Sequence, residues 1–398
     1  MRSHTVSLER PPARDHFLPF HCPVIGEEEI AAVVKVLKSG WLTTGAKVKE
    51  FEKNFSQFVG SNHTVAVNSG TAALHLALEA IGIKEGEEVI LPTMTFAATA
   101  EVVLYLRARP VLVDCEPGTF NMDPDQLEAA ISPKTKAIIP VHFGGQPCDM
   151  DRILEFARAH RLKVVEDAAH ALPARYKDRL IGRIGDITCF SFYATKTITT
   201  GEGGMATTEN PEWAESMRML SLHGISHDAW KRYSAEGSWY YEILRPGYKY
   251  NLTDLAASLG VEQLKKCESF FEERKRIAET YDDGFADLPE ITTPVCRPDV
   301  QHAWHLYVIQ LRLERLTITR NQFIEALKKA NIGTSVHFIP LHLHPYYRDT
   351  FGYQPQDFPN AYSAFERIVS LPIYPGLTAS DVEDVIGVVR AIIETNRR

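Results

Sequence analysis

The protein has 398 residues, of which 44% are hydrophobic and 24% are charged, and its formal net charge at pH 7 is −8. This acidic balance disfavours general binding to nucleic acid or to a membrane surface, and the length allows two domains. The six cysteines form no CxxC pair, which is typical of reduced cytosolic thiols. Residues 1–12 lack the apolar core of a secretory signal, and no apolar run is long enough to span a membrane, so we expect a cytoplasmic protein.

From Gly26 to about Thr208, short β-branched runs alternate with helical stretches. A helix is expected over Glu27–Lys38, with Ile30, Val33, Val34 and Leu37 on one face and Gly40 at its end. Further helices are expected up to Ala80 and at Phe96–Leu106, Pro124–Ile131 and Met150–His160. The candidate strands are Thr64–Val67, Val89–Leu91, Pro110–Asp114, Lys136–Val141, Lys163–Asp167 and Ile187–Tyr193. Several of these strands are apolar throughout, which indicates an α/β domain whose mostly parallel sheet has helices on both faces.

The pattern changes beyond Pro211. The stretch Gly224–Tyr250 is rich in aromatic residues and has no clear period, which is typical of a lid or an interface arm. A long helical pattern from Leu252 to about Phe285 follows it. The remaining expected elements are a strand at Trp304–Leu311, a helix at Asn321–Ala330, a short strand near Thr334–Phe338 and a final helix at Ser380–Thr395. We therefore expect a large domain over residues 1–250, and a smaller α+β domain over 251–398 on which the N-terminal segment can also pack.

A candidate phosphate cradle lies between the strand Thr64–Val67 and the helix that follows it, where the chain reads Ser69-Gly70-Thr71. Gly70 allows close backbone approach, two hydroxyls can donate, and a helix N-terminus favours an anion. The same tripeptide is also a good turn and helix cap, and taken alone that is the simpler interpretation.

Two further motifs carry ionisable side chains. Asp167 ends an apolar strand, at the sheet edge where α/β proteins place ligands, and His170 follows it closely. An acid there can hold a protonated ring nitrogen, although it can equally cap the next helix. Lys196 follows another apolar strand and precedes the turn Gly201–Gly204. Partial desolvation would lower the pKa of such a lysine and make its amine a nucleophile, whereas most lysines in this position are solvated.

Together these motifs supply a phosphate anchor, an acid for a pyridinium and an amine for an aldehyde, which are the needs of pyridoxal 5′-phosphate (PLP). In its motifs and their order, the chain resembles the DegT-type nucleotide-sugar aminotransferases, which are PLP enzymes of fold type I. The resemblance covers nearly the whole chain. It is carried by Gly40–Gly45, Ser69–Leu74, Glu166–His170, Lys196 with Gly201–Gly204, Gly247–Asp254, His302–His305 and Leu371-Pro372.

The resemblance implies a role for each site residue. Lys196 would form the Schiff base with PLP and later move a proton, and Asp167 would pair with the pyridine nitrogen. The remaining cofactor contacts would be Phe96 on the ring face, His170 near the ring hydroxyl, and Ser69, Gly70, Thr71 and Ser191 at the phosphate. Asn251 would reach the phosphate of a neighbouring subunit, which implies a homodimer with shared active sites and makes Gly224–Tyr250 the arm that crosses the interface.

The resemblance also implies the reaction. Glutamate would load the cofactor with an amino group, leaving as 2-oxoglutarate, and a nucleotide-linked keto-sugar would receive that group. Similarity to C4-aminating members in Gly247–Asp254 and His302–His305 favours C4 over C3, and the retained Lys196 favours transamination over 3-dehydration. A PLP-binding regulator without turnover is the alternative from another functional class.

A metal site is disfavoured by the sequence. His337, His342 and His344 fit no zinc spacing and lack acidic neighbours, so we expect no metal. The turn Gly201–Gly204 follows no Walker pattern and leads into a strand, so it does not indicate a nucleotide loop.

Overall fold

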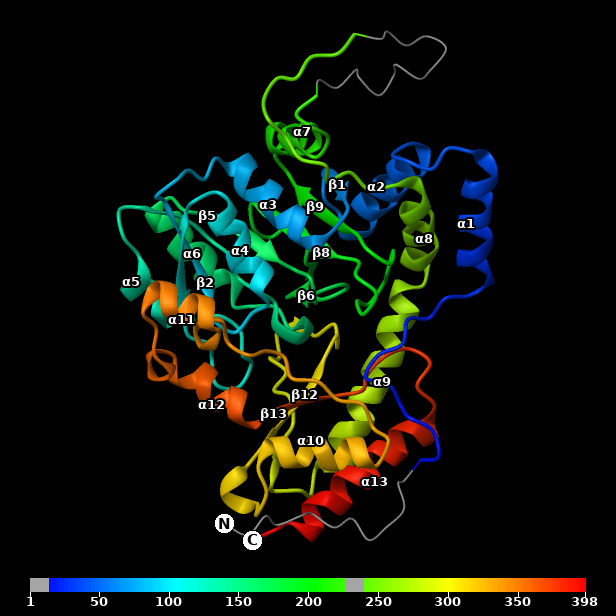
Figure 1. The fold of residues 1–398 in the computed structure, drawn as a ribbon, viewed down its shortest axis with the longest axis vertical. Helices are drawn as coiled ribbons and strands as arrows, with labels where there is room; N and C mark the ends of the chain where they lie inside the picture. Colours follow the sequence, from blue (N-terminus) through cyan, green and yellow to red (C-terminus); the bar gives the residue numbers. More distant parts are fainter. Residues whose placement is uncertain (1–13, 226–239) are drawn as a thin grey trace.

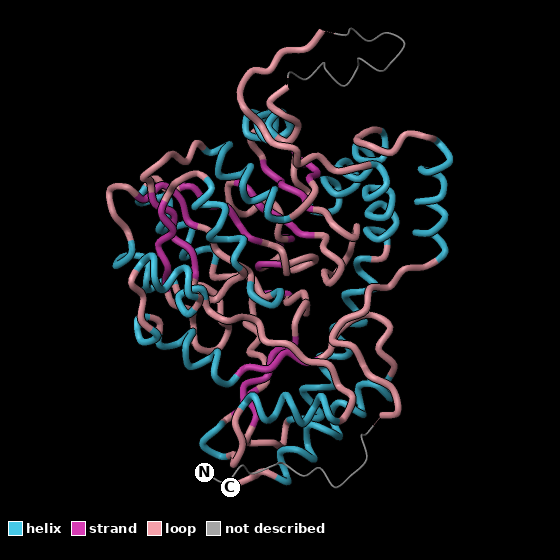
Figure 2. The backbone as a smooth tube through the Cα atoms, viewed as in Figure 1, coloured by secondary structure: helices cyan, strands magenta, loops and turns pink. Residues whose placement is uncertain are grey.

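The computed structural model describes residues 14–225 and 240–398 (Figures 1 and 2). The helices of the first 225 residues are α1 (Glu27–Ser39), α2 (Ala46–Val59), α3 (Gly70–Ile81), α4 (Ala97–Tyr105), α5 (Leu127–Ala130), α6 (Met150–His160) and α7 (Pro211–Leu220). The later helices are α8 (Asp254–Lys265), α9 (Cys267–Phe285), α10 (Arg320–Lys329), α11 (Pro345–Phe351), α12 (Pro359–Arg367) and α13 (Ala379–Thr395).

A seven-stranded sheet forms the centre of the larger part of the molecule. Its strands, in spatial order, are β1 (His63–Val67), β9 (Gly204–Thr208), β8 (Ile187–Ser191), β5 (Lys163–Asp167), β4 (Thr135–Ile138), β2 (Glu88–Pro92) and β3 (Arg109–Val113). Strand β9 runs antiparallel to both of its neighbours, and every other pair is parallel. The predicted mostly parallel α/β sheet is confirmed.

Helices cover both faces of this sheet, as Figure 1 shows. Helices α3, α4 and α7 enclose one apolar core against the sheet, and α2, α6 and α8 enclose the other. This two-sided cover explains why strands such as β2 and β8 are apolar along most of their length. The parallel arrangement places the carboxyl ends of β5 and β8 at one edge, where Asp167 and Ser191 emerge.

The C-terminal part contains a second, antiparallel sheet of β10 (Ile291–Thr292), β12 (Tyr307–Leu311) and β13 (Ile368–Leu371). Helices α9, α10 and α13 pack on it around a third core. A short three-stranded sheet joins β6 (Arg175–Tyr176) and β7 (Arg179–Leu180) to β11 (Val300–Gln301). The N-terminal segment packs here too, because Leu18 pairs with Ile332 in the backbone. The domain boundary at residue 250 stays a prediction. Helix α8 follows this boundary in the sequence but packs on α1 and α2, which precede it.

Several local expectations differ from the structure. The long helical pattern expected from Leu252 to about Phe285 forms two consecutive helices, α8 and α9, which meet at Lys266. The expected strand at Thr334–Phe338 is wrong: Ser335 makes an isolated bridge with Ser370, after which the chain turns into the cavity described below.

The expected helix at Glu27–Lys38 is confirmed as α1, but its apolar side chains Ile30, Val34 and Leu37 lie exposed on the surface. Part of the expected interface arm, residues 226–239 with Trp230, Tyr233 and Trp239, lies outside the described residues. None of the helices in the described ranges is long and apolar enough to cross a membrane.

Candidate active site

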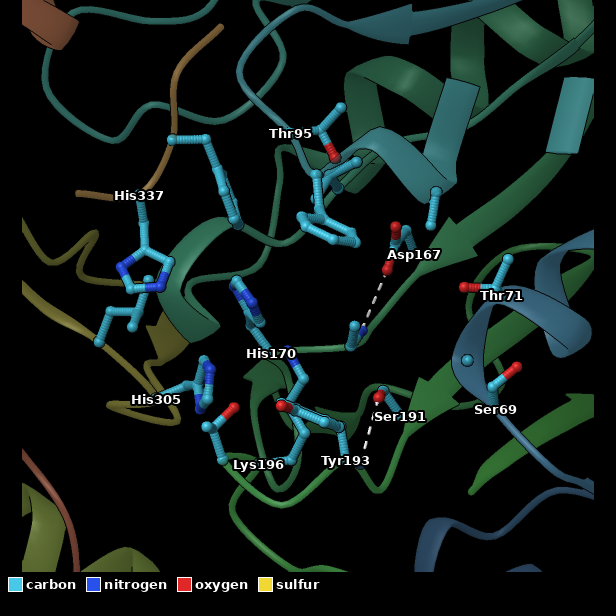
Figure 3. Close-up of a pocket in the computed structure, with 18 of the residues that line it drawn as sticks. Ser69, Thr71, Thr95, Asp167, His170, Ser191, Tyr193, Lys196, His305 and His337 are labelled. Atoms are coloured by element: carbon cyan, nitrogen blue, oxygen red, sulfur yellow. Dashed lines mark hydrogen bonds between the residues drawn. The ribbon is translucent and has the colours of Figure 1, made fainter. Parts of the chain in front are cut away.

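A cavity of about 500 Å³ opens at the carboxyl edge of the large sheet, bordered on its other side by loops of the C-terminal part (Figure 3). Eight of the nine expected site residues line it, namely Ser69, Gly70, Thr71, Phe96, Asp167, His170, Ser191 and Lys196. The ninth, Asn251, does not line the cavity of its own chain, and its side chain donates to Thr44 Oγ1 at 2.7 Å.

One end of the cavity is built for an anion. Ser69 caps α3 by accepting a hydrogen bond from the Ala72 N–H at 3.0 Å. A Cβ on Gly70 would lie 2.9 Å from the Ser191 Cβ, so glycine is needed for the turn to pack directly on the end of β8. The hydroxyls of Thr71 and Ser191 thereby come together beside the free N–H groups of a helix N-terminus, which favours a phosphate.

Asp167 provides a carboxylate on the cavity wall between this end and the middle. Its side chain is 6% exposed, and it accepts hydrogen bonds from Thr99 Oγ1 at 2.8 Å and from the Ala169 N–H at 3.2 Å. Burial raises the pKa of Asp167, although these two donors and the charge of Lys196 act to lower it. A carboxylate buried in this way is suited to a cationic ligand group, because a cation would offset the desolvation that raises its pKa.

The strand end that carries Asp167 is held by a buried network on the opposite face of β5. Glu166 accepts hydrogen bonds from His142 Nε2 at 3.0 Å, Thr188 Oγ1 at 2.6 Å and the Gly185 N–H at 2.7 Å. Burial alone would raise the pKa of Glu166, but these hydrogen bonds bring it below the usual value. The backbone N–H of His142 also donates to the Asp167 carbonyl at 3.2 Å, which ties the network to the cavity wall.

Lys196 lies on the loop that joins β8 to β9. Its backbone N–H donates to the Tyr193 carbonyl at 2.9 Å, and its side chain borders the cavity. Burial lowers the pKa of Lys196 from 10.5 to about 8, with a smaller opposing effect from Asp167. The amine is therefore available in its neutral, nucleophilic form near physiological pH.

The cavity also contains residues that the sequence did not assign to the site. His305 and His337 lie with His170 at the end away from Ser69 and Thr71 in Figure 3. His305 belongs to the motif His302–His305, which is part of the family resemblance. The sequence therefore pointed to this residue but did not indicate its function. The family resemblance implies a place near the sugar-nucleotide entrance for the stretch with His337, and this residue lines the cavity.

The three histidines considered for a metal lie in different places. His337 lines the cavity, His342 is hydrogen-bonded through Nδ1 to Thr93 Oγ1 at 2.8 Å, and His344 precedes α11. Across residues 14–225 and 240–398, no group of three or more His, Cys, Asp or Glu side chains has an arrangement that could hold a metal ion.

Residues 23–390 match the DegT/DnrJ/EryC1/StrS aminotransferase family. The chain belongs to this family. It is 54% identical over 382 residues to the spore coat polysaccharide biosynthesis protein SpsC of Bacillus subtilis, covering 96% of this chain and 98% of SpsC.

Two solved structures extend the comparison. The putative sugar aminotransferase Spr1654 of Streptococcus pneumoniae, in its pyridoxamine-phosphate form, superposes with a TM-score of 0.89 at 39% identity over 95% of this chain and 99% of that one. Helicobacter pylori PseC, an aminotransferase involved in pseudoaminic acid biosynthesis, has a TM-score of 0.88 at 28% identity over 96% and 100% of the two chains.

This aminotransferase uses PLP as its cofactor, as the family does, and Spr1654 is known in its PLP form. The residues in the cavity fit that group. The Ser69–Thr71 turn and Ser191 offer donors for the phosphate, the buried carboxylate of Asp167 suits a protonated ring nitrogen, and the Lys196 amine, with its pKa lowered to about 8, suits the aldehyde.

Proposed function

We propose that the enzyme transfers the amino group of glutamate to C4 of a nucleotide-linked keto-sugar, in the biosynthesis of a cell-surface polysaccharide or amino sugar. The observation that carries the proposal is the shared cavity of Lys196, Asp167 and the Ser69–Thr71 turn, in a chain of this aminotransferase family. The sugar is supported by the relatives, since SpsC is named for polysaccharide biosynthesis and Spr1654 as a putative sugar aminotransferase.

Each residue then has a chemical task. Bound PLP supplies an aldehyde that takes up the amino group and a ring that withdraws electrons. Asp167 keeps a positive charge on the ring nitrogen by offering an ionised partner in a buried place. The Nζ atom of Lys196 would take the proton from the donor carbon and later return one to the product side. Phe96 would contact the face of the ring, and His170 would contact its hydroxyl.

We also propose that two copies share their sites. Asn251 is turned away from the cavity of its own chain, as expected of a residue that serves a neighbouring subunit. Exposed apolar side chains also lie on and after α1, namely Ile30, Val34, Leu37, Trp41 and Leu42. An apolar patch of this kind is typical of a subunit interface.

The function is tested with a panel of UDP-, dTDP- and GDP-linked sugars that carry a 4-keto or a 3-keto group. Glutamate is the donor, the product mass is the readout, and the Lys196→Ala protein is the control. We expect an added amine on a 4-keto sugar with the native protein alone. Amination of the 3-keto sugars only would overturn the C4 assignment. Failure of glutamate to convert the bound cofactor would leave the regulator as the better interpretation.

Shared sites are tested by mixing inactive chains. Lys196→Ala and Asn251→Asp chains are each expected to be inactive alone. If a site takes its lysine from one chain and its asparagine from the other, a mixed dimer has one intact site. Random mixing would restore about one quarter of the native activity. Absence of any restoration after verified subunit exchange would contradict sharing.

A further inference from the structure

The cavity is poor in cations for a site that takes glutamate. Among its lining residues in the described part of the chain, Lys196 is the only lysine or arginine, and the acids are Asp167 and Glu202. Lys196 is committed to the cofactor, yet the donor brings two carboxylates. The remaining polar groups that can carry a positive charge or donate an N–H are imidazoles, those of His21, His170, His305 and His337.

Three of these imidazoles, those of His170, His305 and His337, have a ring nitrogen for which the described residues supply no hydrogen bond. His305 is 6% exposed, packs on the ring of His170 with centroids 4.3 Å apart, and has a buried Nδ1 without a hydrogen-bond partner. His337 is hydrogen-bonded through Nδ1 to Ser370 Oγ at 2.9 Å, so its Nε2 is left for a ligand. In Figure 3 both lie across the cavity from Ser69 and Thr71, at the end opposite the phosphate cradle.

His21 has a partner within the chain, and His170, although its Nδ1 is without a hydrogen-bond partner, is assigned to the cofactor. His21 Nε2 lies 3.1 Å from the carbonyl oxygen of Ala194, and its ring contacts that of Tyr374. His170 has the place that the family resemblance gives to the contact with the cofactor ring. The pair of His305 and His337 is therefore the part of the wall that a substrate can engage.

The electrostatic surroundings of this pair favour an anion. Burial and the charge of Lys196 lower the pKa of His337 to about 4, and burial with the neighbouring His170 lowers the pKa of His305 well below its usual value. Behind them Arg274, which is fully buried, donates through Nη1 to the carbonyls of His305 and Ile373. Lys196 and Arg274 are the positive groups that act on this pair, so a negative ligand would be attracted here, whereas a second cation would be repelled.

We propose that His305 and His337 bind a carboxylate of the amino donor. This inference rests on the proposed function, which supplies glutamate as that donor. In the bound state the Ser370 hydroxyl donates to Nδ1 of His337, which places the ring proton on Nε2, where it donates to the carboxylate. The neutral imidazoles thus take the place that an arginine would occupy in a more polar site, and they do so without a strong permanent charge beside Lys196.

The proposal is tested on the PLP-loaded enzyme with glutarate, a dicarboxylate that carries no amino group and cannot react. Titration calorimetry measures its affinity for the native protein, for His337→Gln, and for His337→Phe, which keeps a ring between Phe20 and Phe338. We expect about a 10- to 100-fold weaker affinity in His337→Phe and a smaller loss in His337→Gln, because a hydrogen bond to a charged group is removed or weakened. His344→Gln, a nearby histidine outside the cavity, is the matched control and should bind glutarate as the native protein does.

Measuring the half-reaction with glutamate and the half-reaction with the keto-sugar separately distinguishes carboxylate binding by His337 from a purely structural role. Both are followed by the cofactor absorbance, which should be unchanged at rest in every variant. His337→Phe should raise the half-saturating glutamate concentration by the same factor as the glutarate dissociation constant, and should leave that of the keto-sugar within about threefold. Ser370→Ala should raise the glutamate value by a smaller factor, and it tests the same bond if His337→Phe fails to fold.

Native glutarate affinity in His337→Phe, or an equal effect on glutamate and keto-sugar, would overturn the proposal and assign the carboxylate to another group, such as one from a partner subunit. A result in which glutamate converts the cofactor in a reaction that depends on His337, while no keto-sugar accepts the amine, would support the carboxylate site and contradict the proposed acceptor.

Discussion

The reactivity of Lys196 can be tested through its dependence on pH. In the cofactor-free protein, burial lowers the pKa of this amine from 10.5 to about 8, and Asp167 opposes the shift. Only the neutral amine attacks an aldehyde, so the rate of Schiff-base formation should rise as the pH rises through about 8. An ordinary solvated lysine would instead gain rate up to about pH 10.

The size of the effect follows from the two pKa values. At pH 7.5 about a quarter of the Lys196 side chains are neutral if the pKa is about 8, against about one in a thousand at a pKa of 10.5. The fold around the lysine therefore increases the reactive fraction roughly 200-fold at that pH. This gain requires no new contact to the amine and comes from the loss of water around it.

The assay mixes cofactor-free protein with PLP over pH 6 to 10 and follows the rise of the imine absorbance, with Lys196→Arg as the baseline. A half-maximal rate near pH 8 is expected. In Asp167→Asn the midpoint should move to lower pH, because the carboxylate that raises the lysine pKa is gone. A midpoint above about pH 9.5 in the native protein, or a shift to higher pH in Asp167→Asn, would refute the reasoning.

Three further outcomes are expected. Gly70→Ala should weaken PLP binding about tenfold, measured by equilibrium titration, because the added Cβ would collide with Ser191; unchanged binding would mean the turn can move away. Glu166→Gln should cost about 2–4 kcal/mol in urea unfolding, since three donors lose a carboxylate. Because the pKa of Glu166 is lowered, its stabilisation exists above the unfolded pKa and is lost as the pH falls, so the variant should also show a flatter stability profile in acid. Trp41→Asp should raise the dimer dissociation constant at least tenfold in sedimentation experiments, and an unchanged constant would place the interface elsewhere.

Much of the framework follows from the sequence because it depends on local patterns. The stretches Lys163–Asp167 and Met150–His160 are the strand β5 and the helix α6 with the expected bounds. The order of the motifs also places Asp167 and Lys196 on one sheet edge, since the carboxyl ends of parallel strands meet there.

What the sequence did not provide are quantities that arise from tertiary contacts. It identified Lys196 but gave no measure of the burial that lowers its pKa. The pattern Thr334–Phe338 resembles a strand, but its residues leave the sheet after one bridge and bring His337 into the cavity. The sequence pattern predicts that α1 has an apolar face. It does not indicate whether that face packs on the protein's own core or on a second chain.

The antiparallel strand β9 has a consequence for how the lysine loop can change. Ser191, where β8 ends, pairs with Gly204, where β9 begins, and Phe192 pairs in turn with Gly203. The loop with Lys196 therefore leaves and re-enters the sheet at the same point, as a hairpin connection with no helix crossing behind it. A change in the length of this loop therefore does not by itself shift the register of the other strands. The loop is nevertheless anchored to the layers beneath it, since Ile198 is buried in the core and the Thr199 N–H donates to Gln263 of α8, so a grafted loop would have to keep both contacts.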